Sequence, residues 1–115
     1  MLFLFCFVCL VARSSAQQEP SQNRREISIV ARNHTFTPNK IEATQDDLVK
    51  ITLRSEDVPV SFAIDAYRII KRVAGQTSIS FEFRADQPGT FRFYCNLTAD
   101  AACKDMSGTF TVKPK

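Results

Sequence analysis

The sequence predicts an all-β fold, a sandwich or open barrel of strands that each bury one face. Apolar and polar residues alternate with a period of two along several segments, which is the pattern of half-buried strands. Residues that favour turns separate these segments, and no segment sustains a helical period. A chain of 115 residues has room for one such domain.

Five segments carry the alternation. We expect antiparallel strands around residues 27–31, 49–53, 79–83, 91–94 and 109–112. Their apolar positions should form the core, and these are Ile27, Ile29, Ala31, Val49, Ile51, Leu53, Ile79, Phe81, Phe83, Phe91 and Phe93.

Turn signals lie between the expected strands. They are Thr37-Pro38-Asn39, residues 44–47, Ala74-Gly75 and residues 86–89, all rich in Pro, Gly, Asn or Asp. Residues 67–72 are ambiguous, since they could form a turn of helix, a strand or a loop.

The first 25 residues are not expected to belong to the domain. Residues 1–16 read as a secretory signal peptide, an apolar run followed by small residues. Because the run is shorter than the roughly 20 apolar residues that span a bilayer, we expect no membrane insertion after cleavage. Residues 17–25 form a polar leader, and the domain covers residues 26–115. The protein is therefore predicted to be exported, to the periplasm or the exterior.

Charge and cysteine content narrow the range of possible functions. Without residues 1–16, 14 basic and 12 acidic residues remain, a net charge of +2 that is too small and too evenly spread for nucleic-acid binding. Two cysteines remain, Cys95 and Cys103, and in an oxidising compartment they favour one disulfide.

Nothing in the sequence indicates an enzyme. There is no Ser-His-Asp set, no recognisable pair of carboxylates and no Gly-rich phosphate loop, and the chain has only three glycines. Its single histidine, His34, leaves general acid–base catalysis without its usual residue. We expect a monomer without catalytic activity.

Four motifs occur in order along the chain. They are Phe36-Thr37-Pro38, residues 55–64 (SEDVPVSFAI), residues 83–95 (FRADQPGTFRFYC) and residues 106–112 (MSGTFTV). The most specific is an Asp-x-Pro-Gly turn before an aromatic strand that ends in cysteine. From Ser28 to Val112 the chain resembles the cupredoxin family, in particular the copper domains of cytochrome oxidase subunit II and nitrous-oxide reductase. The resemblance implies a Greek-key β-sandwich or barrel.

The resemblance also implies a copper site, but the ligands differ. A mononuclear blue-copper site needs two histidines and a cysteine in one plane, with a weak axial methionine. The position of the family's first histidine is Val60, which has no donor atom. On the dicopper loop, Cys95 and Met106 match, whereas the second cysteine corresponds to Ala99 and the histidine to Cys103.

The candidate metal site therefore consists of sulfur donors, Cys95, Cys103 and Met106. Soft sulfur donors select Cu(I), so copper is a possible cofactor if both cysteines are reduced. The resemblance also places the two cysteines close together, as disulfide partners whose bond would contribute roughly 2–3 kcal/mol. Export and the presence of two cysteines only favour the disulfide, and then no cofactor is expected.

Three functions remain open. The first is a secreted, metal-free, non-catalytic binding or accessory module. Its protein partner is unknown and would contact the loops Glu56–Phe62 and Asn96–Lys104, because loops on a rigid sandwich carry function. The second is a Cu(I) carrier or chaperone that uses Cys95, Cys103 and Met106. The third, an electron carrier, would need imidazoles from His34 or a partner chain.

Overall fold

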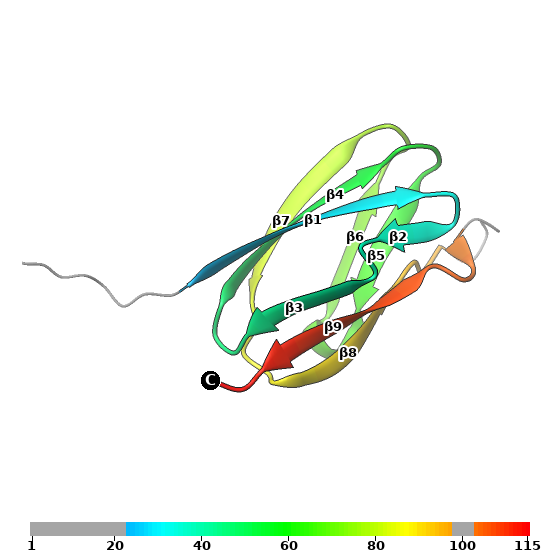
Figure 1. The fold of residues 1–115 in the computed structure, drawn as a ribbon. Coiled ribbons are helices and arrows are strands. Elements are labelled where there is room, and N and C mark those ends of the chain that lie inside the picture. The colour runs from blue at the N-terminus through cyan, green and yellow to red at the C-terminus, as the bar shows by residue number, and fades with distance from the viewer. Residues whose placement is uncertain (1–22, 98–102) are drawn as a thin grey trace, which may run out of the picture.

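The structure is a computed structural model that describes residues 23–97 and 103–115 (Figure 1). The expected signal peptide and residues 17–22 of the expected leader lie outside these residues. The described residues form nine strands and one 3₁₀ turn. The elements are β1 (Arg24–Arg32), β2 (Thr35–Thr37), β3 (Lys40–Thr44), β4 (Leu48–Ser55), β5 (Val60–Ile64), η1 (Asp65–Tyr67), β6 (Ile69–Val73), β7 (Ser78–Arg84), β8 (Gly89–Tyr94) and β9 (Ser107–Lys113).

The strands form two sheets that pack face to face, as Figure 1 shows. One sheet has the order β2-β1-β4-β7, and the other has the order β3-β9-β8-β5-β6. The predicted all-β sandwich is confirmed. All five expected strands are present, as β1, β4, β7, β8 and β9.

The core lies between the sheets and is built from the alternating positions. Val49, Ile51 and Leu53 of β4 are fully buried, and the polar residues between them are partly exposed. Aromatic rings fill the centre. The ring of Phe93 stacks on that of Phe62 with 4.9 Å between centroids, and meets the edge of Phe36 at 5.4 Å.

The alternation suggested that all strands would be antiparallel, but this prediction is wrong for two pairs of strands. β1 runs parallel to β4, and β3 runs parallel to β9. The cause is a change of sheet at Thr37-Pro38-Asn39, where the chain leaves β1 as β2 and joins the other sheet as β3. β4 then returns to the first sheet after one more reversal, on the other side of β1, and so runs in the same direction as β1.

One boundary also differs from the prediction. β1 begins at Arg24, so Arg24 and Arg25 belong to the first strand and not to the leader. The ambiguous residues 67–72 divide between the end of η1 and the edge strand β6.

The predicted turns are confirmed, and side chains hold two of them. In the turn after β3, the Asp47 carboxylate accepts the backbone N–H of Thr44 at 2.9 Å. In the turn before β8, the Tyr67 hydroxyl donates to the Gln87 carbonyl at 2.9 Å and accepts the Gln87 N–H at 3.1 Å. Partial burial of this hydroxyl raises the pKa of Tyr67 above its usual value.

Across residues 23–97 and 103–115, no helix has the length and apolar character that crossing a membrane requires.

Candidate functional site

The candidate site lies at one end of the sandwich, where three core strands begin or end. Val60 is the first residue of β5, Cys95 follows β8 directly, and Met106 precedes β9 directly. Cys95 and Cys103 form a disulfide, with 5.3 Å between their Cα atoms. This distance is within the usual range for a disulfide. The expected pairing of the two cysteines is therefore present.

The site is enclosed in the core. The exposed fractions are 8% for Cys95, 1% for Cys103, and 2% each for Met106 and Val60. Backbone hydrogen bonds fix the segment, since the Cys95 N–H donates to the Met106 carbonyl at 3.1 Å and the Met106 N–H donates to the Cys103 carbonyl at 3.2 Å. The structure thus brings together the three predicted sulfur residues and the valine at the expected histidine position.

Backbone amides point at both sulfur atoms. The Ser61 N–H donates to Cys95 Sγ and the Leu97 N–H donates to Cys103 Sγ, each at 3.2 Å. The Ser61 hydroxyl donates to the Asn96 side-chain oxygen at 2.5 Å and accepts the Asn96 N–H at 2.7 Å. Ser61 therefore ties β5 to the segment after β8, and its buried hydroxyl is satisfied.

The donor set does not fit a blue-copper centre. Val60 offers no lone pair, and the two cysteine sulfurs are bonded to each other and not present as thiolates. His34 lies exposed in the turn between β1 and β2, on the rim and not among the buried sulfur atoms. Ala99, at the position of the second dicopper cysteine, lies outside the described residues. Among the residues that the structure places, no three His, Cys, Asp or Glu side chains gather as a metal site.

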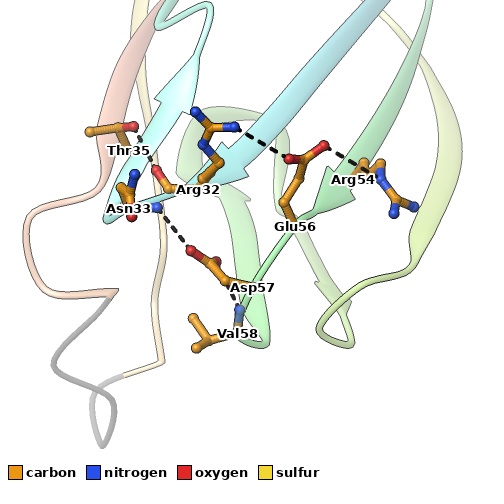
Figure 2. Close-up of polar contacts among 7 residues, drawn as sticks. All are labelled: Arg32, Asn33, Thr35, Arg54, Glu56, Asp57 and Val58. Carbon is orange, nitrogen blue, oxygen red and sulfur yellow. Dashed lines mark hydrogen bonds and ion pairs between the residues drawn. The ribbon is translucent and has the colours of Figure 1, made fainter.

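The rim of the site is a short loop fastened to the β1–β2 hairpin (Figure 2). The Asp57 carboxylate accepts the N–H of Asn33 at 3.0 Å and that of Val58 at 2.8 Å. These hydrogen bonds, with a smaller contribution from the nearby His34, hold the pKa of Asp57 below its usual value. Figure 2 also shows Glu56 between two arginines.

These two ion pairs join the same loop to strands of the first sheet. The Glu56 carboxylate lies 3.5 Å from Arg32 of β1 and 3.8 Å from Arg54 of β4. All three side chains are well exposed, so each pair adds little to stability by itself. Their effect is to orient the loop on the first sheet.

The expected contact loops are shorter than the sequence suggested. Val60, Ser61 and Phe62 are buried residues of β5, so the first loop is reduced to residues 56–59. In the second range, residues 98–102 lie outside the described residues, Asn96 and Leu97 are half-buried, and Lys104 is exposed.

The fold and the site together define a class of protein. Two sheets with a strand that changes sheet, and a buried Cys and Met where β8 ends and β9 begins, are the arrangement of small β-sandwich copper proteins and their relatives. The profile of the cupredoxin-like domain family matches residues 2–112. The chain belongs to this family.

Solved structures with the same fold confirm the architecture at low sequence identity. A heme-copper terminal oxidase chain aligns with a TM-score of 0.71 and 20% identity, over 90% of this chain and 76% of that chain. Auracyanin A, a blue copper protein from Chloroflexus aurantiacus, aligns with a TM-score of 0.66 and 14% identity, over 79% of this chain and 100% of that chain. The metal-binding domain of the Cu(I)-exporting P-type ATPase CopA from Streptococcus pneumoniae, determined with Cu(I), aligns with a TM-score of 0.66 and 17% identity, over 82% and 90%.

Proposed function

We propose that this protein is an exported, non-catalytic cupredoxin-like domain in which a disulfide has replaced the copper site, and that it works as a monomeric binding or accessory module. One observation carries the proposal, namely the buried Cys95–Cys103 disulfide at the position where the family holds metal. A disulfide and a metal ion both cross-link the loop between β8 and β9, so one can take over the structural role of the other.

The chemistry of the neighbours supports the exchange. Val60 is a buried apolar member of the same core cluster as the disulfide, and its side chain has no donor atom for a cation. The amides of Ser61 and Leu97 already donate to the two sulfur atoms. Because both sulfur atoms of the disulfide accept a hydrogen bond, the two backbone N–H groups beside them are not left without a partner in the core.

A binding role needs a contact surface, and the rim supplies it. The exposed loop of residues 56–59 is tied to the β1–β2 hairpin by the hydrogen bond from Asn33 to Asp57 and is oriented by two arginines, so ordering the loop on binding would cost little entropy. A photoreactive amino acid at the exposed Pro59, which leaves the Asp57 hydrogen bonds in place, should cross-link the partner in the native exported compartment. The same group at Lys40, on the edge strand β3, should not, and equal cross-linking from both positions would remove the loop from the proposal.

A second candidate, Cu(I) binding, is favoured by the gathering of three sulfur atoms in one buried place. Reduced Cys95 and Cys103 with Met106 would offer the soft donors that Cu(I) prefers. The likeness to the CopA metal-binding domain determined with Cu(I) agrees with such a role. Electron transfer would need imidazole ligands, and the single histidine lies on the rim.

A thiol count on the exported protein separates these functions. Intact mass should be measured before and after anaerobic addition of Cu(I), without a reductant and then with one. Zero free thiols and no copper adduct without reductant support the disulfide-bonded module. Two free thiols as isolated and one copper adduct, lost in Cys95→Ser and weakened in Met106→Leu, would replace the proposal with Cu(I) handling.

A further inference from the structure

A row of side chains crosses the outer face of the second sheet, on the side away from the core. Ala63 of β5 pairs with Ile70 of β6 on one side and with Tyr94 of β8 on the other. Directly opposite residues on neighbouring strands project from the same face. Ala63 is fully buried yet is not a member of the core cluster, so it forms a low point between the larger Ile70 and Tyr94.

Ile70 is the anomaly in this row. It is 61% exposed, and it is the one large hydrophobic side chain that is exposed among the residues the structure describes. It also lies on β6, the last strand of its sheet, whose outer edge has no strand partner in the described fold. An exposed apolar residue on an open strand edge is a surface that natural proteins usually avoid.

Two exposed charged residues follow Ile70 on this edge, and they leave the isoleucine itself uncovered. Lys71, the charged residue beside Ile70, alternates to the other face, where its ammonium lies 5.6 Å from the centre of the Phe81 ring. Lys71 therefore lies on the side of β6 that faces β7 and does not cover the outer face. The residue that shares the outer face with Ile70 is Arg72, two positions further along the strand.

The charge of this surface is positive. Arg92 stacks on the Tyr94 ring with its guanidinium carbon 4.5 Å from the centroid, and Arg72 is exposed. The acidic residue in contact with this row, Asp65, already accepts the Tyr94 hydroxyl at 2.7 Å. Within the described parts of the chain, neither Arg72 nor Arg92 has a carboxylate within 4.0 Å. Positive charge beside an exposed isoleucine favours an acidic, partly apolar partner.

We propose that the free edge of β6 binds an extended acidic segment of a protein partner, which adds to the sheet as a further strand. The backbone of the segment would pair with β6, an apolar side chain would extend the Tyr94–Ala63–Ile70 row, and an Asp or Glu two positions away would meet Arg72. This inference goes beyond the proposed function, since β6 lies outside the two expected contact loops and the argument does not depend on whether the copper site is retained.

Two other kinds of partner fit less well. One exposed isoleucine offers little apolar surface for insertion into a membrane interface. The Tyr94 ring is covered by Arg92 and fixed by Asp65, so it is a poor platform for stacking bases.

The test is selection of peptides from a random display library on the mature protein. Enriched peptides should carry an apolar residue two positions from an Asp or Glu. When one such unlabelled peptide is added to isotope-labelled protein, it should shift the amide resonances of residues 69–73. Its affinity should fall by about tenfold or more in Arg72→Glu, and also in the milder variant Ile70→Thr, and should weaken as salt is raised. Lys40→Glu, an equal charge change on the exposed edge strand β3 of the same sheet, should bind as the unsubstituted protein does.

Any of three results would overturn the inference. The enriched peptides could lack the acidic–apolar spacing, or the resonance shifts could lie away from β6. Folded Arg72→Glu and Ile70→Thr could also bind the peptide as tightly as the unsubstituted protein does. Binding to phosphatidylserine vesicles that both variants lose, with no peptide enriched, would assign the surface to a membrane and reject the protein partner. Because both positions are exposed, thermal unfolding should show that each variant remains folded.

Discussion

Reduction of the Cys95–Cys103 disulfide should destabilise the domain by an amount set by loop length. The two cysteines are separated by 8 positions, so the bond closes a loop of about nine residues. The loss of chain entropy in the unfolded state then corresponds to about 2.6 kcal/mol at room temperature. For a domain of this size that is a fall in Tm of about 10–20 °C.

Changing both cysteines to alanine should cost more than reduction. The Ser61 and Leu97 amides would lose their sulfur acceptors, and each buried N–H left unsatisfied adds roughly 1 kcal/mol. The order of stability should therefore be oxidised, reduced, then the double alanine variant.

Urea unfolding checks this order. The chain has no tryptophan, so far-UV circular dichroism is the suitable signal. Met106→Leu, which keeps the buried volume, is the matched control. It should cost less than about 1.5 kcal/mol and preserve the difference between oxidised and reduced protein. A reduced protein within about 0.5 kcal/mol of the oxidised one would refute the loop-closure reasoning.

Three further changes test other parts of the structure. Asp57→Asn should destabilise the protein near neutral pH and not in acid: the hydrogen bonds from Asn33 and Val58 lower the pKa of Asp57 below its ordinary 3.8, so the stabilisation by the carboxylate is complete above that value and is lost as the pH falls through the folded-state pKa. Urea midpoints of both proteins at neutral and acid pH should converge, and a constant difference would contradict the assignment. Phe93→Ala, which empties the centre of the aromatic core, should cost about 3–5 kcal/mol by chemical unfolding, and a loss near zero would mean that the rings are loosely packed. Gly108→Ala should cost about 1–3 kcal/mol because its Cβ would collide with the Phe93 ring and the Asn39 carbonyl, and an unchanged Tm would contradict that close approach.

The longer strands could be predicted from the sequence, whereas the four strands of five residues or fewer, β2, β3, β5 and β6, were not predicted as strands, although β3 buries one face. β4 alternates cleanly, and its three inward residues are fully buried as expected. All five residues of β5 are buried, and because Ala63 on its outer face is apolar, the contrast between apolar and polar positions is weak and the alternation rule passes over the segment. β6 is short and mostly exposed, which left residues 67–72 ambiguous. Parallel pairing is invisible to the same rule, because the side-chain period is the same in both directions.

The candidate site was predicted in part, for a similar reason. The closeness of Cys95, Cys103 and Met106 followed from the resemblance to the cupredoxin family, since ligands of one metal must converge. The role of Ser61 was not predictable, because its partners lie on a segment more than thirty positions away and one of them is a sulfur atom. Only the Val60-Ser61-Phe62 motif pointed to that place in the sequence.

The change of sheet between β2 and β3 has a consequence for the order of folding. The β8–β9 hairpin and its disulfide join residues that are near in sequence, so they can assemble early in an oxidising compartment. The parallel pairs of β1 with β4 and of β3 with β9 join residues far apart, and such pairing is slow. During oxidative refolding, we expect the chain to be covalently closed at its β8–β9 end while β1 and β3 are still undocked, and their docking to set the overall rate of folding.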